Sequence, residues 1–223
     1  MNKATADEAA PKSPRRKTSK KSRITREELI EGALNALIED GATGITTRRI
    51  AEKAAVPLGT LHYHFETKEA LLYSVLDSLG SGLALHLRMG TAGCKTLEDC
   101  ITRVLEIDWD IVRESLDIQV VQYELTFYAL RNKEAAWIAK HQYDDYIKSH
   151  ADVFALHVPE GTPDGQTKVN RLAKFVMAGI DGIIVQELAA PGTNDVKDIT
   201  VAAIALAGHL GLLGEEKAAS PGI

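Results

Sequence analysis

The sequence has few cysteines and no long apolar run, and each of these absences excludes a class of protein. Only Cys94 and Cys100 occur among 223 residues, which argues against a disulfide framework and fits a reducing cytoplasm. No run approaches eighteen apolar residues, so no membrane span is expected. The N-terminus also lacks the apolar core of a signal peptide. We therefore expect a cytoplasmic protein with no membrane partner.

Sequence patterns of common catalytic and metal sites are missing as well. There is no Gly-rich phosphate loop, no Ser/His/Asp spacing of a nucleophilic triad and no metal-ligand motif. His62 and His64 would diverge by about 200° on a helix. Cys94 and Cys100 are irregularly spaced relative to His86. We expect no enzyme activity, no metal and no cofactor.

Alternating Val-, Ile- and Thr-rich segments bounded by hairpin turns are absent, so no β-sheet is predicted. Apolar residues recur at helical spacing instead. The first helix is expected to begin with Thr25 and Glu28 as a capping box and to stop at Gly41. The pattern predicts an all-α protein of about nine helices, at residues 25–41, 46–54, 57–65, 67–89, 96–115, 117–131, 133–156, 167–190 and 196–213.

Charge is distributed unevenly along the chain. The net charge is -5, yet residues 1–75 carry 13 basic and 10 acidic residues, and the remainder carries 13 and 21. Residues 1–23 are polar, without periodicity, and hold eight Lys or Arg against two acids. They predict a disordered basic arm that contacts a polyanion, although a solvated tail is the alternative. Residues 215–223 are expected to form a flexible tail.

Residues 46–65 have the spacing of a helix-turn-helix: a helix, a short turn and a second helix. Ile50 and Ala51 are expected to anchor the first helix. The second helix is too short to be stable alone, so Leu61 and Phe65 must hold it against its neighbours. Its remaining side chains would then face outward, toward DNA; they are Leu58, Gly59, Thr60, His62, Tyr63 and His64.

The stretch GATGITTRRIAEKAAVPLGTLHYHFETKEALL, residues 41–72, resembles the N-terminal domain of TetR-family (tetracycline-repressor-like) transcriptional regulators. The resemblance covers roughly residues 25–75. It implies a helix-turn-helix DNA-binding domain at 24–68 and a ligand-binding and dimerisation domain at 69–214. Ala55 departs from the usual Gly, and a left-handed conformation there would cost about 1–2 kcal/mol.

The resemblance also implies roles for single residues at the DNA. Thr47 and Tyr63 are expected to bind phosphate, and Lys68 to do so with help from a helix N-terminus. Arg48 can reach a guanine edge with its guanidinium fork. Arg49 is left open between DNA contact and a solvated face.

The short second helix supplies the other expected contacts. Leu58 and Thr60 are expected to contact base edges or a thymine methyl group. Gly59 permits close approach of the backbone. His62 stands where the family generally has Tyr, which leaves its phosphate contact open, and His64 is expected to cap the helix or to contact the DNA backbone.

The C-terminal part carries a group of aromatic residues that could line an effector cavity. Trp109, Tyr123, Phe127 and Tyr128 are the predicted effector-binding residues, against the alternative that each is ordinary core. His86, on the long helix 67–89, could report occupancy of the cavity to the DNA-binding end, or be an ordinary surface histidine.

The segment FVMAGIDGIIVQELAA is apolar around nearly its whole circumference, and the last helix is similar. Such helices must be buried on all sides, either within one subunit or, as we predict, in a four-helix interface of a homodimer. A two-fold dimer would require a near-palindromic DNA site. The predicted interface residues are Phe175, Val176, Gly179, Ile180, Ile183, Ile184, Ile204 and Leu210.

These expectations combine into one functional hypothesis. The chain is predicted to be a ligand-responsive transcriptional repressor that binds double-stranded operator DNA as a homodimer and is released by a small-molecule effector. The alternative is a helical small-molecule-binding protein or enzyme with an incidental helix-turn-helix.

Overall fold

The structure is a computed structural model that describes residues 19–214, with side chains from Arg26 onward. Within this range the chain forms nine helices and no strand. They are α1 (Ser19–Gly44), α2 (Thr47–Lys53), α3 (Leu58–His64), α4 (Lys68–Gly90), α5 (Leu97–Glu114), α6 (Leu116–Arg131), α7 (Ala136–Ala155), α8 (Gly165–Ala189) and α9 (Lys197–His209). The predicted all-α fold is confirmed for the described residues. Residues 1–18 of the predicted basic arm and the tail 215–223 lie outside them.

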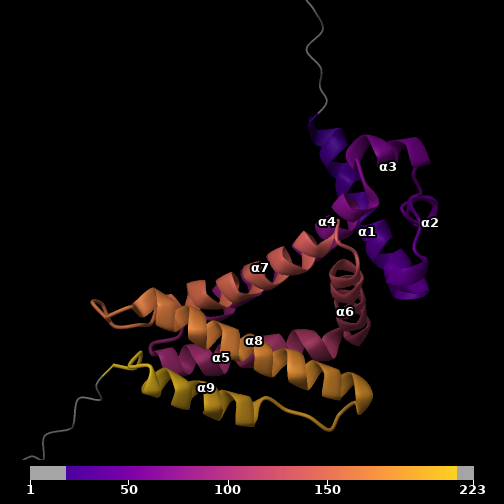
Figure 1. The fold of residues 1–223 in the computed structure, drawn as a ribbon. Helices are drawn as coiled ribbons and strands as arrows, with labels where there is room; N and C mark the ends of the chain where they lie inside the picture. The colour runs from indigo at the N-terminus through magenta and orange to yellow at the C-terminus, as the bar shows by residue number, and fades with distance from the viewer. Residues whose placement is uncertain (1–18, 215–223) are drawn as a thin grey trace, which may run out of the picture.

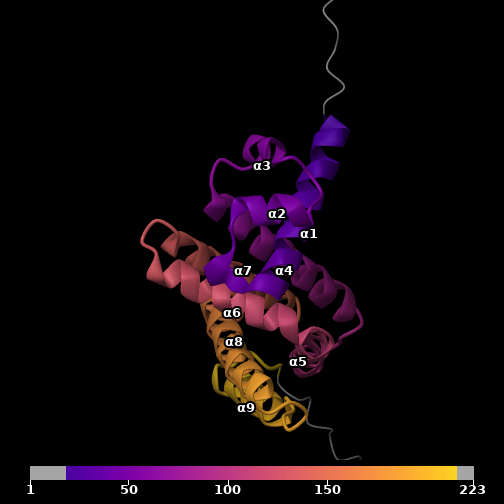
Figure 2. The same ribbon diagram turned by 90° about the vertical axis from the view of Figure 1, so that its right-hand side faces the viewer.

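The helices form a head and a body that share three long elements (Figures 1 and 2). The helices α1, α2 and α3 lie together at one end of the molecule, and α5, α8 and α9 lie toward the other. Between them, α4 packs along α7, and α6 packs against α1. The shared helices therefore bring the head and the body into direct contact.

Two apolar cores follow from this arrangement. The head core contains Leu61 of α3 and Leu72 of α4, but also Leu125 of α6 and Ile138 of α7. The second core is built from α5, α8, α9, the last turn of α4 and the C-terminal half of α7. Packing of the head core therefore crosses the predicted domain boundary at 68/69, because α6 and α7 cover apolar faces that α1–α3 leave open.

Helix α1 differs from its prediction at both ends. It begins at Ser19, so residues 19–23 are helical and Thr25 lies inside the helix, where it cannot be the N-cap residue. No Gly or Pro lies between Ser19 and Thr25 to end the helix earlier. Gly41 breaks the helix as predicted, with φ 71° and ψ 166°, but one more helical turn follows it.

Threonine caps mark the starts of three helices where the sequence predicted them. Thr46, Thr67 and Thr96 have extended backbones, and their side chains accept hydrogen bonds from backbone N–H groups three residues later. The three donor–acceptor distances are 3.1–3.2 Å. Each cap satisfies a backbone donor that the helix leaves unpaired.

By length and composition, α4 alone among the described helices could cross a membrane. Several of its apolar side chains are, however, buried inside the protein, although Leu85 and Met89 are exposed. Leu71, Leu72 and Val75 are buried in the head core, and Leu87 is buried in the second core. This pattern is that of a core helix that both cores share.

The turn between α2 and α3 places a non-glycine residue in the left-handed region. Ala55 has φ 53°. Its N–H donates to the carbonyl of Glu52 (3.1 Å), and the N–H of Val56 donates to the carbonyl of Ala51 (3.0 Å). This pair of bonds is the Schellman ending of a helix, in which the left-handed position usually holds Gly. The strain that the sequence predicted conditionally for Ala55 is therefore present.

Ala55→Gly is expected to stabilise the protein by about 1 kcal/mol, because relief of the left-handed strain exceeds the extra unfolded-state entropy of glycine. Urea unfolding at fixed protein concentration measures the change. Ala155→Gly is the control, since Ala155 is an exposed residue of α7 with helical backbone; that change should be neutral or destabilising. Equal effects of the two substitutions would contradict the prediction.

Candidate nucleic-acid interface and effector cavity

Helix α3 is held by two apolar side chains and exposes most of the others. Leu61 and Phe65 are 1% and 3% exposed, as predicted. The guanidinium of Arg26 lies over the Phe65 ring, 5.0 Å from its centroid. A helix of seven residues cannot be stable alone, so these contacts fix its position in the head.

The outward side of α3 contains the predicted DNA-contacting residues. Leu58, Gly59, His62 and Tyr63 are exposed, and Tyr63 is 74% exposed. A Cβ atom added at Gly59 would meet open space, so a ligand can approach the backbone there. Thr60 and His64 are half-buried, and the His64 ring meets the edge of Tyr63 at 5.2 Å between centroids. Among the described contacts, His64 does not cap α3. The expected contacts of these residues with DNA stay predictions.

Helix α2 presents one arginine to solvent and uses the next one internally. The Arg48 side chain is 82% exposed, and among the described residues its one polar contact is to Glu52 on its own helix, at 3.3 Å. Thr47 lies half-buried in the first turn. Such an exposed guanidinium beside α3 is free to meet a base or phosphate.

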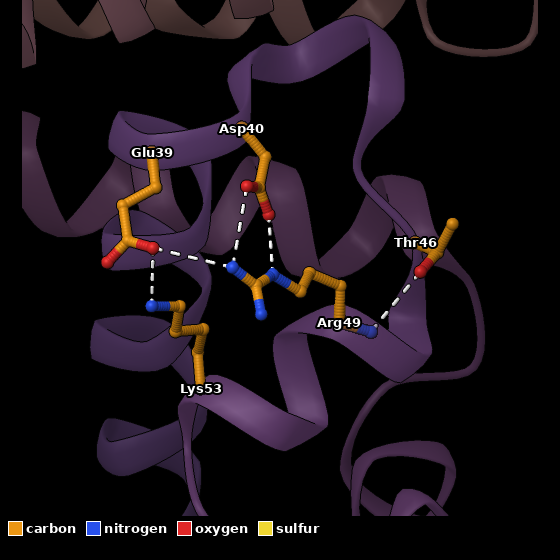
Figure 3. Close-up of polar contacts among 5 residues, drawn as sticks. All are labelled: Glu39, Asp40, Thr46, Arg49 and Lys53. Atoms are coloured by element: carbon orange, nitrogen blue, oxygen red, sulfur yellow. Dashed lines mark hydrogen bonds and ion pairs between the residues drawn. The ribbon is translucent and has the colours of Figure 1, made fainter.

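Arg49 instead joins α2 to the end of α1 (Figure 3). Its Nε donates to Oδ2 of Asp40 at 2.6 Å, and its Nη2 lies 3.4 Å from Oε2 of Glu39. Lys53 pairs with the same Glu39 oxygen. The hydrogen bond from Arg49 lowers the pKa of Asp40 below its ordinary value. Arg49 thus joins two helices of the head while its side chain stays 39% exposed; whether it also contacts DNA stays open.

Lys68 lies at the start of α4 but is not fully free for phosphate. Its Nζ lies 5.0 Å from the centroid of the Tyr128 ring, and burial lowers its pKa. The hydroxyl of Tyr128 donates to Oε1 of Glu69 at 2.8 Å. The first turn of α4 is therefore fixed against α6, and a phosphate contact by Lys68 remains a prediction.

A cavity of about 490 Å³ lies in the body, between five helices. Its wall is formed by parts of α4, α5, α6, α7 and α8. The apolar share of the wall comes from leucine, isoleucine, valine and methionine side chains, among them Leu79, Leu83, Ile111, Ile118 and Met177. This volume suits a small organic molecule.

Hydrogen bonds between tyrosines and polar partners from other helices hold much of the cavity wall. The Tyr123 hydroxyl donates to the backbone carbonyl of Asp181 at 3.0 Å. The Tyr146 hydroxyl donates to Gln122. Burial raises the pKa of Tyr146 to about 12 and also raises the pKa of Asp181. The tyrosines are thus neutral donors at physiological pH.

The most deeply buried polar group on the wall is an Asp–His pair. Asp108 of α5 is 3% exposed and His150 of α7 is 0% exposed. Nε2 of His150 lies 2.9 Å from Oδ2 of Asp108, and its Nδ1 lies 2.8 Å from the carbonyl oxygen of Tyr146. Burial by itself lowers the pKa of His150, but Asp108 and the hydrogen bonds outweigh burial and raise it.

The aromatic residues predicted to line the cavity are mostly elsewhere. Tyr123 lines it, as predicted. Trp109 is buried in the second core but does not reach the cavity, and Phe127 is 57% exposed on α6. Tyr128 contacts the start of α4 instead. The prediction is wrong for these three residues because helical spacing identifies a face and not the element that covers it. His86, the proposed reporter, does line the cavity.

Thr126, Gln142 and His150 of the polar wall were missed, although the sequence holds a signal for them. Gln142, Tyr146 and His150 are spaced i, i+4, i+8 on α7, so they lie on one helix face. Gln119, Gln122 and Thr126 form a similar row on α6. A row of polar side chains on the inner face of a helix indicates a cavity, because polar groups are costly to bury in a dry apolar core without hydrogen-bond partners.

Half of the predicted dimer residues belong to the core of the chain. Val176, Ile180, Ile184 and Leu210 are 0–6% exposed within the single chain. Ile183 and Ile204 are half-buried against the same core, and a Cβ atom on Gly179 would come within 2.8 Å of Ile199 on α9. Those seven residues are therefore mainly intrachain; Phe175, at 39% exposure, points outward.

A different face of α8 and α9 is exposed and apolar. On α8 it contains Phe175, Ala178, Gly182 and Val185, spaced three and four residues apart, and Gly182 borders open space. On α9 the exposed residues include Val201, Ala202 and Ala205. We call these seven residues the α8/α9 face.

The head and the body define a helix-turn-helix protein with a separate ligand cavity, and comparison with known proteins gives its family. The family described as "Bacterial regulatory proteins, tetR family" matches residues 29–75. The HTH-type transcriptional regulator TtgR of Pseudomonas putida is 38% identical over 191 residues, which are 81% of this chain and 88% of TtgR. The chain belongs to the TetR family, and it is a DNA-binding transcription regulator, as predicted.

Two further proteins are similar over most of the chain. The nicotine-responsive transcriptional repressor HdnoR of Paenarthrobacter nicotinovorans is 26% identical over 176 residues, covering 78% of this chain and 89% of HdnoR. The crystal structure of a TetR transcription regulator from Haloarcula marismortui matches with a TM-score of 0.65 at 18% identity, over 86% of this chain and 100% of that one. The latter similarity supports the fold.

Arg48→Ala is expected to weaken binding to a selected DNA site by about ten- to a hundredfold without changing the unfolding midpoint, because within the described part of the chain its guanidinium has no partner outside its own helix. Arg49→Ala is the matched variant and should lower the unfolding midpoint, since it removes the tie between α1 and α2. Fluorescence anisotropy and urea unfolding measure the two effects. The assignment fails if Arg48→Ala leaves DNA affinity unchanged.

Proposed function

We propose that this chain is a ligand-responsive transcriptional repressor that acts in the cytoplasm. In this proposal a homodimer binds a near-palindromic operator through α2 and α3 of both subunits. A small molecule that fills the body cavity lowers the affinity of the dimer for the operator. The family membership and the repressor HdnoR among its relatives support repression in response to a small molecule.

The observation that carries the proposal is that α4 and α6 each contribute both to the helix-turn-helix head and to the wall of the body cavity. Near its middle, α4 lines the cavity through Leu79, Leu83 and His86, and its first turn follows directly from the helix-turn-helix. Helix α6 lines the cavity through Gln122 and Tyr123 and packs against α1 in the head. A change in the cavity wall therefore acts on helices that position α3.

One contact joins the middle of α6, next to the cavity residue Tyr123, directly to α1 in the head. Glu124, the residue after Tyr123, accepts a hydrogen bond from the backbone N–H of Ala42 at 2.7 Å through its Oε2. A Cβ atom on Gly41 would lie 3.3 Å from the same oxygen. The carboxylate thus packs against the break in α1. Movement of Tyr123 on binding would be passed to the head through this contact.

Release of DNA requires that the effector bind two conformations of the dimer with different affinity. Shifting a population from almost fully bound to almost fully released takes a difference of about 5.5 kcal/mol. A cavity whose wall is made of helices from both ends of the molecule supports such a difference, because helix positions in the two conformations change its shape.

The α8/α9 face supports the homodimer. Seven exposed apolar or small residues on two adjacent helices form a patch of the kind that marks an interface. Two copies of α8 and α9 would pack as a four-helix bundle, in which small residues allow close approach. If the two-fold axis of this dimer runs along the direction from head to body, the two α3 helices lie on the same side of the dimer, as a palindromic operator requires.

Val185→Glu is expected to convert the proposed dimer into monomers, because it places a charge within the apolar α8/α9 face. Sedimentation or light scattering measures the mass. Leu130→Glu is the matched control, since Leu130 is a similarly exposed apolar residue on α6, outside that face. If Val185→Glu remains dimeric, or if Leu130→Glu dissociates equally, the assigned interface is incorrect.

The proposed function is tested by selecting DNA sites from a random-sequence pool with the full chain. We expect a near-palindromic site whose half-sites lie about one helical turn apart, bound with a strong salt dependence. The Val185→Glu monomer should bind one half-site weakly. Selection that returns no preferred sequence, or binding that does not depend on salt, would rule out the repressor and favour a small-molecule-binding protein.

A further inference from the structure

Asp108 holds a buried oxygen that has no hydrogen-bond partner among the described residues. Its Oδ2 is engaged by His150, whereas its Oδ1 is buried and unpaired. Asp108 lines the cavity. An unpaired buried polar atom costs about 1–3 kcal/mol, and more when the group is charged. An oxygen kept in this state at the wall of a ligand cavity is suited to accept a hydrogen bond from what fills the cavity.

The neighbouring His150 fixes the direction of that hydrogen bond. Its Nδ1 faces a backbone carbonyl and must donate. Its Nε2 faces the carboxylate of Asp108, so a proton lies between them. With that proton on the imidazole, the pair is an ion pair, and Oδ1 carries two lone pairs and no hydrogen. The ligand must therefore supply the donor.

The charges on the cavity wall determine which sign of charge the ligand should carry. Besides the Asp108–His150 pair, the cavity is lined by Asp181 and by the exposed residues Asp110 and Glu114, and His86 is the sole further basic residue of the described lining. No lysine or arginine lines the cavity in the described part of the chain. In a partly buried cavity of low dielectric, this excess of carboxyl groups repels anions and attracts cations.

The rest of the wall determines the body of the ligand. Apolar side chains of α4, α5, α6 and α8 alternate with the rings of Tyr123, Tyr143 and Tyr146. Such a wall favours an apolar or aromatic skeleton, and aromatic rings also interact favourably with cations. The volume of about 490 Å³ accommodates one such molecule.

We propose that the cavity binds an amphiphilic organic cation whose protonated amine donates a hydrogen bond to Oδ1 of Asp108. The inference rests on the proposed function in that it takes this cavity as the effector site. Asp108 binds the ammonium group, the other carboxyl groups favour its charge, and the apolar wall holds the skeleton.

Three matched probes separate charge from hydrogen bonding on the unaltered full chain. N-benzylpiperidine is protonated at neutral pH and has one N–H donor. Its N-methyl quaternary salt has the same charge and no donor, and N-benzoylpiperidine is neutral. Calorimetry should show that the protonated amine binds at least about tenfold more tightly than either of the others, as expected for a hydrogen bond to a charged group.

Asp108→Asn should remove this preference and lower the affinity for the protonated amine by at least about tenfold. Asp117→Asn is the matched control, since Asp117 is an exposed residue of α6 outside the cavity wall, and should bind the amine like the unaltered chain. If Asp108→Asn does not fold, the comparison of the three probes on the unaltered chain decides alone.

The proposal is overturned if the protonated amine does not bind at millimolar concentration, if the quaternary salt or the amide binds as tightly, or if a folded Asp108→Asn binds the amine unchanged.

Failure of the proposed function would look different. In that case the amine would bind with the stated preference, but no DNA site would be selected, or the amine would leave affinity for the selected site unchanged. If a DNA site is selected but the protonated amine is not preferred, the proposal of a cationic ligand is wrong and the proposed repressor function still stands.

Discussion

The packing of α6 against α1 is the contact on which the rest of this structure depends. The helices α1, α2 and α3 cannot cover their own apolar faces, because α2 and α3 have seven residues each. Leu125 and Val121 of α6 complete the head core. The same helix turns Gln119 and Gln122 toward the cavity. Burial thus makes one helix part of both the head core and the cavity wall, and this shared packing is the basis of the proposed coupling.

Polar groups at the junctions are engaged within the chain, while those left available are at the two binding surfaces. Arg49 and Glu124 are partnered across helices. Arg48, in contrast, extends into solvent, and Oδ1 of Asp108, a residue of the cavity wall, has no hydrogen-bond partner among the described residues. The strained turn at Ala55 lies between α2 and α3. Strain and unsatisfied groups persist where the surrounding structure overcompensates for them, and such positions are often functional.

The helices and the DNA-binding motif could be predicted from the sequence because their signals are local. Thr46, Thr67 and Thr96 define helix starts through bonds to residues three positions away. Leu61 and Phe65 mark the inward side of α3 because helical periodicity places them together. The beginning of α1 was missed because a polar segment without Gly or Pro gives no signal for where a helix starts.

What only the tertiary structure decided is which element covers each face. The sequence determined that residues 175–190 are apolar nearly all round. Whether Val176 or Val185 is the exposed one depends on where α5, α7 and α9 lie. Likewise, Phe127 and Tyr146 are both aromatic residues within predicted helices, yet Phe127 is exposed and Tyr146 lines the cavity. The physical reason is that helix periodicity relates residues of one helix to one another, whereas burial depends on contacts between residues distant in the chain.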